Sequence, residues 1–298
     1  MRYAIGIDIG VTNVKCVVIS DAGEILLRDQ TATHAEKSDW PEGVKKYLAQ
    51  VEKGRGEAQW LGIAAPGLAA PGGSCISWMQ GRLGEVEGLK WTEFLGRKWA
   101  VPVLNDAQAA LLGEVWKGSA AGAKNAILLT LGTGVGGAMM VDGRILKGRI
   151  GRAGHIGHMS LDVDGVEDIA RTPGSLESLI GNYTIRERSG GRFESTHDLV
   201  AAAQRGDQKA RQVWERSVLQ LGCAIVSMIN IADPEVVIIG GGIATAGPAL
   251  FDPLNRVLDK CEWRPHGHRA KIVAATLGEY AGAIGAAFNA MQIGRRDA

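Results

Sequence analysis

The sequence has few cysteines, and they form no recognisable motif. Its four cysteines stand singly, without a CxxC pair and without the density typical of secreted disulfide scaffolds. The sequence therefore predicts no disulfide-stapled fold. These residues are Cys16, Cys75, Cys223 and Cys261.

Long apolar runs and an excess of one charge are also missing. No uninterrupted apolar run reaches about 18 residues, so we expect no membrane span. Lys and Arg total 33 against 32 for Asp and Glu, the net charge is +1, and no basic stripe is present. This balance argues against a nucleic-acid partner, because proteins that bind nucleic acids use basic surfaces that contact the phosphate backbone. We expect the partner to be a small molecule.

The first residues show no targeting pattern. The segment MRYAIGIDIG enters an apolar strand at once and lacks the charged and hydrophobic regions of a signal peptide. We therefore expect a cytoplasmic protein.

Two stretches share one design. Residues 3–20 and 125–143 each read as an apolar strand, a turn of Gly and Thr, and a second apolar strand. We expect two β-hairpins whose glycines reach positive φ and expose backbone amides, which is the chemistry of an anion-binding nest. One such turn in each half of the chain predicts a nucleotide clamped between two related lobes. The glycines concerned are Gly6, Gly10, Gly132, Gly134, Gly136 and Gly137.

Strands and helices alternate along the rest of the chain, which indicates an α/β fold. The length of 298 residues suggests two domains of about 150 residues each. Residues 66–88, rich in glycine, predict a long irregular connection. We expect further strands over 24–30, 60–65, 101–104, 235–239 and 271–275, and helices over 38–54, 91–99, 107–118, 175–189, 196–205, 207–232 and 280–291.

The pair Asn105-Asp106 follows a short strand and precedes a helix. Polar residues at the carboxyl end of a strand lie where α/β folds place ligands. A carboxylate there can take the proton of an acceptor hydroxyl during phosphoryl transfer. The alternative is that Asp106 only caps the helix that begins at Ala107.

Five motifs together resemble the ROK family of bacterial sugar kinases, glucokinase-like enzymes and sugar-responsive repressors. The resemblance spans residues 3 to about 290 and lies in the order and spacing of the motifs. They are Asp8-Ile9-Gly10-Val11-Thr12, Asn105-Asp106-Ala107, Gly132-Thr133-Gly134-Val135-Gly136-Gly137, Gly154-His155-Ile156-Gly157-His158-Met159 and Gly240-Gly241-Gly242.

The resemblance implies two actin-like, ribonuclease H-like lobes with a cleft between them, and an ATP-dependent kinase that phosphorylates a hexose or hexose derivative, at C6 by analogy. The small lobe would comprise residues 1–110 with a C-terminal helix over 280–298, and the large lobe residues 111–279. ATP and Mg²⁺ would be required, and family habit favours a homodimer. Nucleotide binding would fall to Asp8, which steers Mg²⁺ through water, and to Gly10, Thr12, Gly132, Thr133, Gly134, Gly241 and Gly242.

On the sugar side, the resemblance makes Asp106 the catalytic base. Asn105, Gly67, His155, His158 and Glu177 would contact the sugar together with Asp106, and Glu177 would reach the C1 and C2 hydroxyls. Simpler interpretations stay open for two of them. His158 is as readily a histidine with a structural hydrogen bond, and Glu177 is a favourable acid in the first turn of a helix.

The chain departs from the family pattern at two places. The family has Glu-x-Gly-His where this chain has His155 to His158, and a histidine cannot accept two hydroxyl hydrogen bonds as a carboxylate does. Most relatives carry a Cys-x-Cys-Gly-x-x-Gly-Cys zinc motif, whose cysteine positions here hold Asp168, Ala170 and Ser175. We therefore expect an altered sugar preference and no zinc.

Other interpretations of the same residues remain. Gly132, Gly134 and Gly137 match GxGxxG, but a strand follows them instead of the helix that a dinucleotide fold needs. Three rival functions are a catalytically degenerate sugar-binding protein, a sugar-sensing regulator, and an acyl-phosphate or ATPase activity of the same superfamily. A regulator would need a DNA-binding helix-turn-helix before the first hairpin, and we expect none there because the hairpin begins at residue 3.

Overall fold

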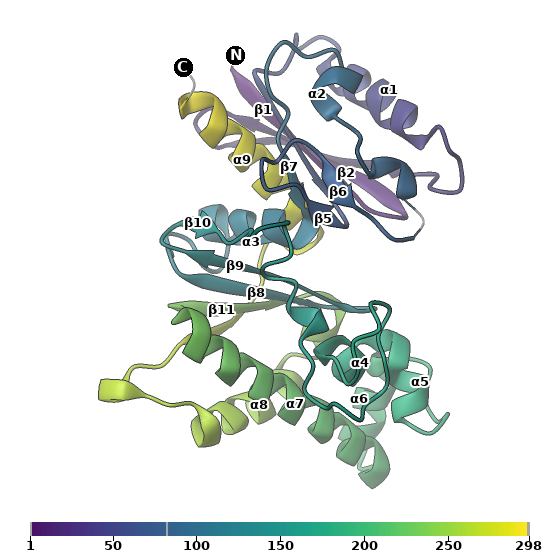
Figure 1. The fold of residues 1–298 in the computed structure, drawn as a ribbon, viewed down its shortest axis with the longest axis vertical. Coiled ribbons are helices and arrows are strands. Elements are labelled where there is room, and N and C mark those ends of the chain that lie inside the picture. Colours follow the sequence, from purple (N-terminus) through teal and green to yellow (C-terminus); the bar gives the residue numbers. More distant parts are fainter. Residues whose placement is uncertain (1, 82, 297–298) are drawn as a thin grey trace. The chain divides into compact units, whose positions relative to one another are not determined.

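The chain forms two compact units in the computed structural model, which describes residues 2–81 and 83–296. The first unit comprises Met1–Gly122, Lys147–Ala153 and Leu277–Ala298. The second comprises Ala123–Leu146 and Gly154–Thr276. The ribbon in Figure 1 shows a sheet with helices in each of them.

The first unit is built on a five-stranded sheet in the order β3-β2-β1-β4-β7. The pairs β1–β2 and β2–β3 are antiparallel, whereas β1–β4 and β4–β7 are parallel. The carboxyl ends of three parallel strands therefore meet at one edge of the sheet. The strands are β1 (Tyr3–Ile9), β2 (Asn13–Ser20), β3 (Ile25–Ala32), β4 (Trp60–Ala65) and β7 (Val103–Asn105), and the helices are α1 (Trp40–Glu52), α2 (Trp91–Phe94), α3 (Asp106–Lys117) and α9 (Ala281–Arg296).

Helix α9 packs very closely on this sheet because glycines face it. A Cβ on Gly6 would lie 1.8 Å from Ala283 O, and a Cβ on Gly62 would lie 2.0 Å from Ala286 O. The same helix packs on α3, where a Cβ on Gly285 would lie 1.7 Å from Ala109 O. The small-residue sequence of α9 is thus explained by backbone contact on two sides.

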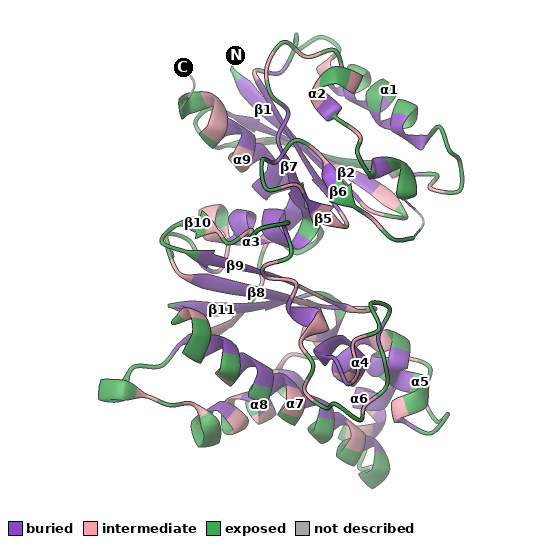
Figure 2. Cartoon of the chain, in the orientation of Figure 1, coloured by how far each residue is buried: buried purple, intermediate pink, exposed green. Residues whose placement is uncertain are grey.

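The second unit holds a sheet of matching design, in the order β10-β9-β8-β11-β12. Strands β8 and β9 form an antiparallel hairpin, and β11 lies parallel to β8 and β12. Figure 2 shows buried residues concentrated along the strands of both sheets. The strands are β8 (Ala126–Leu131), β9 (Val135–Val141), β10 (Arg144–Ile145), β11 (Val236–Gly240) and β12 (Lys271–Ala274), and the helices are α4 (Leu176–Ile180), α5 (Ile185–Arg188), α6 (Thr196–Gln204), α7 (Gln208–Ala232) and α8 (Pro248–Cys261).

Both expected hairpins and the α/β class are confirmed, but two expected helices are shorter. The helix expected over 91–99 ends at Phe94, because Gly96 takes a φ of +64° and turns the chain. The helix expected over 175–189 is interrupted at Gly181, which is extended with ψ near 148°. The connection over 66–88 is also less irregular than expected: it contains the β5–β6 hairpin (Leu68–Ala69 and Ile76–Trp78) and a 3₁₀ turn, Gly84–Val86.

The expected lobe boundary after residue 110 falls inside α3, which belongs wholly to the first unit. The expected C-terminal helix corresponds to α9, which the structure describes to Arg296; residues 297 and 298 of that prediction lie outside the described residues. Residue 1 of the small lobe lies outside them too.

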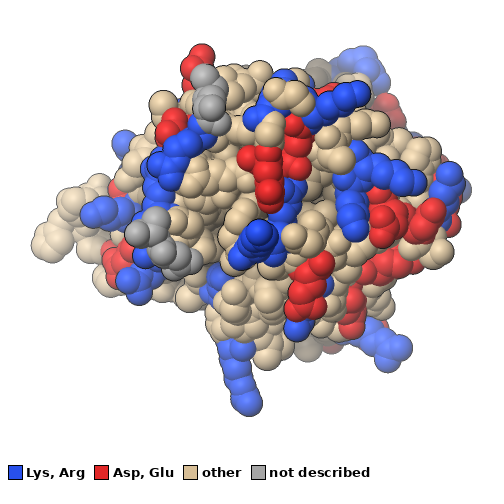
Figure 3. Space-filling model, turned by 90° about the horizontal axis from the view of Figure 1, so that it is seen from above, with Lys and Arg blue, Asp and Glu red and all other residues tan. Residues whose placement is uncertain are grey.

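The surface carries both signs of charge. On the face drawn in Figure 3, Lys and Arg side chains are interspersed with Asp and Glu side chains. Within the described ranges, every helix falls short of the combination of length and apolarity needed to cross a bilayer.

Candidate active site

In the first unit, candidate residues follow the carboxyl ends of the three parallel strands. Asp8 lies near the end of β1, Gly67 comes two residues after β4, and Asn105 ends β7. The parallel pairing of β1 with β4 and of β4 with β7 brings these ends to one edge. The sheet therefore gathers segments that are far apart in sequence (Figure 1).

Asn105 is the residue that caps α3. Its Oδ1 accepts hydrogen bonds from the amides of Ala107 at 3.0 Å and Gln108 at 3.3 Å. In return, the Gln108 side-chain oxygen accepts a hydrogen bond from the backbone amide of Asn105. Its Nδ2 donates to Gly67 O at 3.0 Å, which ties the end of β7 to the segment after β4. The interpretation of Asp106 as the cap is therefore wrong: Asp106 is the first residue of the helix.

Asp106 is held in place yet stays accessible. Its Oδ1 accepts the amide of Ala107 at 2.8 Å, while the residue as a whole is exposed. Loss of hydration among the surrounding protein atoms raises the pKa of Asp106, and the hydrogen bonds from Ala107 and Asn105 oppose this shift. A carboxyl group with these properties is suited to accept a proton from a bound hydroxyl.

Asp8 is the second carboxylate of this edge. Burial and the charge of Asp106 raise the pKa of Asp8 to about 7, while Lys15 opposes the shift. Gly282 at the start of α9 makes room for it, because a Cβ there would lie 2.4 Å from Asp8 Oδ2. Mg²⁺ is a hard cation that prefers oxygen ligands, and two neighbouring carboxylates supply them.

The turn after β1 is closed by its own backbone. The amide of Gly10 donates to Asn13 O at 3.0 Å, and Thr33 donates to Thr12 O through its amide and to Gly10 O through its hydroxyl. The Gly10 amide is thus engaged within the turn, while the Thr12 side chain is exposed.

In the second unit, the glycine turn between β8 and β9 is braced from outside. Asn182 N donates to Gly132 O at 2.9 Å and Tyr183 N donates to Thr133 O at 3.0 Å. The interruption of the helix at Gly181 is what brings these amides to the turn. Thr133 at its tip is exposed.

The reason for the glycines differs from the expectation. None of the six glycines expected to reach positive φ does so. Close approach explains several of them instead: a Cβ on Gly134 would lie 2.1 Å from Glu177 Oε2, and a Cβ on Gly137 would lie 2.9 Å from Gly154 O. A Cβ on Gly132 would meet no atom of the described residues within 4 Å, so this position borders open space.

A pocket of about 610 Å³ opens beside this turn, within the second unit. Its size is typical of small-molecule sites. Thr196 Oγ1, at its wall, is buried and has no hydrogen-bond partner among the described residues. The pocket is lined by Gly132, Thr133, Asn182, Ser195, Thr196, His197, Val200, Ala201, Gln204, Gly242, Ile243, Thr245 and Ala246.

The three glycines after β11 have different roles. Gly241 has a φ of +86°, and a Cβ there would lie 2.3 Å from Leu131 O. Gly242 lines the pocket, and a Cβ there would meet nothing within 4 Å. Gly241 thus serves backbone packing, and Gly242 faces the space available to a ligand.

Sequence reasoning missed most of the pocket wall. Asn182 and residues 195–204 carried no motif, and only the tertiary fold brings them beside the glycine turn. The one local signal is the Ser195 cap of α6, which accepts the amide of Asp198 and starts that helix at the pocket.

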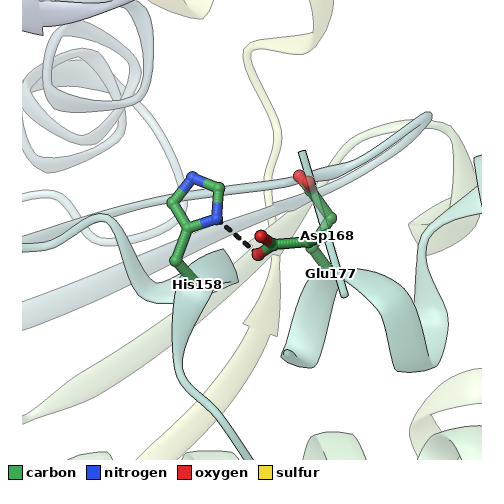
Figure 4. Close-up of side chains that lie close together, drawn as sticks. All are labelled: His158, Asp168 and Glu177. Atoms are coloured by element: carbon green, nitrogen blue, oxygen red, sulfur yellow. Dashed lines mark hydrogen bonds and ion pairs between the residues drawn. The ribbon is translucent and has the colours of Figure 1, made fainter. Parts of the chain in front are cut away.

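A third group of candidates, His155, His158 and Glu177, lies in the second unit. The segment after His158 pairs with the start of α4 through Leu161 N to Gly174 O and Leu176 N to Met159 O, both 2.9 Å. This pairing brings His158 close to Glu177 (Figure 4).

The members of this group differ in their contacts. Glu177 is buried, and its Oε2 accepts the amide of Val135 at 2.9 Å. His155 Nε2 is buried without a partner in the described part of the chain. Burial lowers the pKa of His155, and repulsion from a protonated His158 would lower it further. His158 Nδ1 lies 2.7 Å from Asp168 Oδ2.

These residues do not fit a closed zinc site. His158, Asp168 and Glu177 bring ligand atoms within 4.8 Å of one another, but no thiolate is among them. His158 and Asp168 are hydrogen-bonded to each other, and Glu177 holds a backbone amide. A histidine and two carboxylates, of which His158 and Asp168 are bonded to each other, do not make the closed, thiolate-rich tetrahedral site of a structural zinc.

Comparison with known proteins extends over almost the whole chain. A model of the ROK family matches residues 4–293. The chain is 30% identical over 315 residues to a glucokinase from Halalkalibacterium halodurans, covering 95% of this chain and 93% of that protein. It is also 30% identical over 289 residues to an N-acetylmannosamine kinase from Vibrio cholerae, covering 95% and 98%.

Solved structures show the same similarity. A ROK hexokinase from Thermus thermophilus superimposes with a TM-score of 0.85 at 27% identity, covering all of both chains. A ROK glucokinase from Streptomyces griseus, in complex with glucose and AMPPNP, superimposes with a TM-score of 0.79 at 26% identity, covering 97% of this chain and 99% of that one.

Proposed function

The chain belongs to the ROK family and has its actin-like α/β fold, and from this premise we propose that it is an ATP-dependent sugar kinase. The reaction is transfer of the γ-phosphoryl group of ATP to a hydroxyl, at C6, of a hexose or hexose derivative. The observation that carries this proposal is the accessible Asp106 carboxylate, fixed on the capped start of α3.

Asp106 is the proposed base. As the hydroxyl oxygen of the sugar bonds to the γ-phosphorus, its proton passes to Asp106, and the bond between that phosphorus and the leaving oxygen of ADP breaks. The raised pKa of Asp106 supports this role, because it makes the carboxylate a better proton acceptor.

ATP is assigned to the second unit and to the turn after β1. The pocket of about 610 Å³ is suited to adenosine, with Gly242 at its wall, and the Thr196 hydroxyl, which has no partner among the residues described, supplies a polar group for it. Thr133 with Gly132 and Gly134 would hold the phosphates. Gly241 acts here through backbone packing, and the proposed clamp is completed by Asp8, Gly10 and Thr12.

Asp8 is the residue proposed to hold Mg²⁺ through water. A magnesium ion, when bound with ATP, neutralises charge that develops on the phosphates. The pair of carboxylates, Asp8 and Asp106, supports the presence of a cation, since burial and, after it, the charge of Asp106 raise the pKa of Asp8.

The sugar contacts are proposed for Asn105, Gly67, His155, His158 and Glu177. Asn105 uses its carbonyl oxygen on α3, and its amide group donates to Gly67 O and to Asp106, so its proposed role is to hold Asp106 beside the sugar hydroxyl. Glu177 uses Oε2 on Val135, so its Oε1 is the atom proposed to bind sugar hydroxyls.

We also propose a cytoplasmic homodimer. The long helix α7 exposes Leu219, Cys223 and Ile231 along with the polar Ser227 and Asn230, and a second copy would cover this mixed face. Light scattering on the purified protein tests this assignment, and a monomer at micromolar concentration would contradict it.

The function is tested by ADP release from Mg²⁺-ATP with a panel of hexoses, amino sugars, N-acetyl sugars and epimers such as mannose and allose. We expect one class of sugar to stimulate the rate, and we expect the product to be a sugar phosphate by mass spectrometry. ADP release without any sugar would favour an ATPase.

Silence across the panel, with ATP and sugar binding intact, would instead favour a degenerate sugar binder. His155 is the specific reason to keep this second candidate, since its Nε2 is buried without a partner in the described residues. The variant His155→Glu restores the family residue, and a gain of turnover in it would identify His155 as the cause.

A further inference from the structure

The His158 ring is held by one buried carboxylate. Its Nδ1 lies 2.7 Å from Asp168 Oδ2, and the Asp168 side chain has no exposed surface, whereas about a third of the His158 side chain is exposed. Figure 4 shows the other ring nitrogen, Nε2, turned away from both carboxylates. No hydrogen bond to this nitrogen occurs among the described residues.

The loop around Asp168 is built to keep this carboxylate ionised. Its Oδ1 accepts the amides of Ala170 at 2.8 Å and Thr172 at 2.9 Å. Arg171 adopts a φ of +62° so that the chain can turn back around the carboxylate. Burial alone would raise the pKa of Asp168, but the bonds from His158 and from the backbone amide of Thr172 lower it below its ordinary value.

An ionised carboxylate only accepts hydrogen bonds, so Nδ1 of His158 must carry the proton that it shares with Asp168. In a neutral imidazole, a proton on Nδ1 leaves Nε2 as an acceptor. A metal ion on Nδ1 would impose the opposite arrangement, because a metal-bound imidazole donates from its other nitrogen.

We propose that Asp168 is a positioning residue that fixes the Nδ1–H tautomer of His158 and thereby presents Nε2 as an acceptor to a sugar hydroxyl. This inference rests on the proposed sugar kinase function. In this chain the Asp168 carboxylate orients the His158 ring, as a metal ion on Nδ1 would. The nitrogen that faces the sugar is then a hydrogen-bond acceptor, whereas with a metal on Nδ1 it would be a donor. On this account His158 is oriented without zinc, and a sugar hydroxyl at this position donates its proton to Nε2.

The decisive variant is Asp168→Asn. The asparagine oxygen can still accept the amides of Ala170 and Thr172, but its NH₂ group then faces Nδ1 and can only donate. The imidazole is forced into the other tautomer, with the proton on Nε2. The same substitution in a catalytic triad leaves the geometry intact and yields the wrong tautomer.

Two readouts separate positioning from a structural role. Nitrogen-15 NMR of the histidine ring, assigned with the variant His158→Gln, reports the tautomer without any activity. We expect an unprotonated Nε2 in the wild type and a protonated one in Asp168→Asn. In kinetics, we expect the sugar KM of Asp168→Asn to rise about 10- to 100-fold, with the KM for ATP unchanged.

The matched control is Asp164→Asn, which removes an exposed charge from the same loop. It should behave as the wild type in both readouts. Equal losses in the KM values for sugar and ATP, with lowered thermal stability, would make Asp168 merely structural and overturn the proposal. One tightly bound zinc per chain whose removal abolishes activity would overturn it as well.

The two claims fail separately. A protonated Nε2 in the wild type, in an enzyme that phosphorylates sugars, refutes the positioning role alone. The expected tautomer in a protein that phosphorylates no sugar refutes the kinase function and leaves only the tautomer assignment. If Asp168→Asn does not fold, the wild-type spectrum and metal content still decide the matter.

Discussion

Glu177 accepts the backbone amide of Val135 at 2.9 Å, and this bond ties the first turn of α4 to the strand that follows the glycine turn. The amides of Asn182 and Tyr183 hold the carbonyls of the same turn. The turn is therefore fixed by the segment 177–183 before any ligand binds, which lowers the ordering cost of binding.

Two glycines of this turn should respond differently to alanine. In Gly134→Ala the new Cβ would lie 2.1 Å from Glu177 Oε2, so we expect lower stability by about 1–3 kcal/mol and weakened ATP binding. In Gly132→Ala the Cβ meets nothing within 4 Å, so the fold should persist while the KM for ATP rises. Urea denaturation and ATP titration distinguish the two. Normal ATP affinity in both variants would remove this turn from the phosphate site.

Asp8 should make stability depend on pH. Its pKa is raised to about 7, so the folded protein keeps a proton that the unfolded chain has lost above roughly pH 4. The contribution of Asp8 to stability is thus present at low pH and is lost as pH rises through about 7. We expect Asp8→Asn to flatten this part of the stability profile without ligand, measured by urea denaturation between pH 5 and 8. The exposed Asp252→Asn is the control and should retain the wild-type profile.

The same shift predicts proton release on binding. A cation beside Asp8 favours the ionised carboxylate, so Mg²⁺-ATP should release protons at pH 6.5. Calorimetry in buffers of different ionisation enthalpy measures this release. Equal release by wild type and Asp8→Asn would assign the protons to another group.

The cap of α3 should matter for stability and for the position of Asp106. Asn105→Ala removes the acceptor for two helix amides and the bond to Gly67 O, and we expect a loss of about 1–2 kcal/mol in the free energy of unfolding. Asn105→Asp keeps a good cap and loses the donors to Gly67 O and to Asp106. It should therefore recover most of the stability, and equal losses in both variants would contradict the capping account.

The hairpins were predictable because their signal is local. In residues 3–20 and 125–143, apolar strands flank glycine turns, and the structure confirms both hairpins. The end of α7 at Ala232, followed by the C-cap Asp233 and Pro234, was predictable for the same reason, since proline cannot continue a helix.

Features that depend on tertiary contacts were not predictable. Asn105 and Asp106 are both good capping residues, and only the folded chain, in which Asn105 Oδ1 accepts the amides of Ala107 and Gln108, shows which one occupies the cap. Gly181 interrupts a helical pattern because the following amides bind the glycine turn, and the sequence holds no trace of that contact. Thr196 and Asn182 reach the pocket only through the folded second unit.

Transfer of the γ-phosphoryl group in a single turnover, measured with labelled ATP and the sugar found in the panel, tests the role of Asp106 most directly. Asp106→Asn keeps an acceptor for the Ala107 amide, so we expect normal folding and normal binding of both substrates. The rate of sugar phosphate formation should fall at least about 100-fold, because the hydroxyl proton has lost its acceptor. A rate within a few-fold of the wild type would show that Asp106 is not the base and would contradict the central claim.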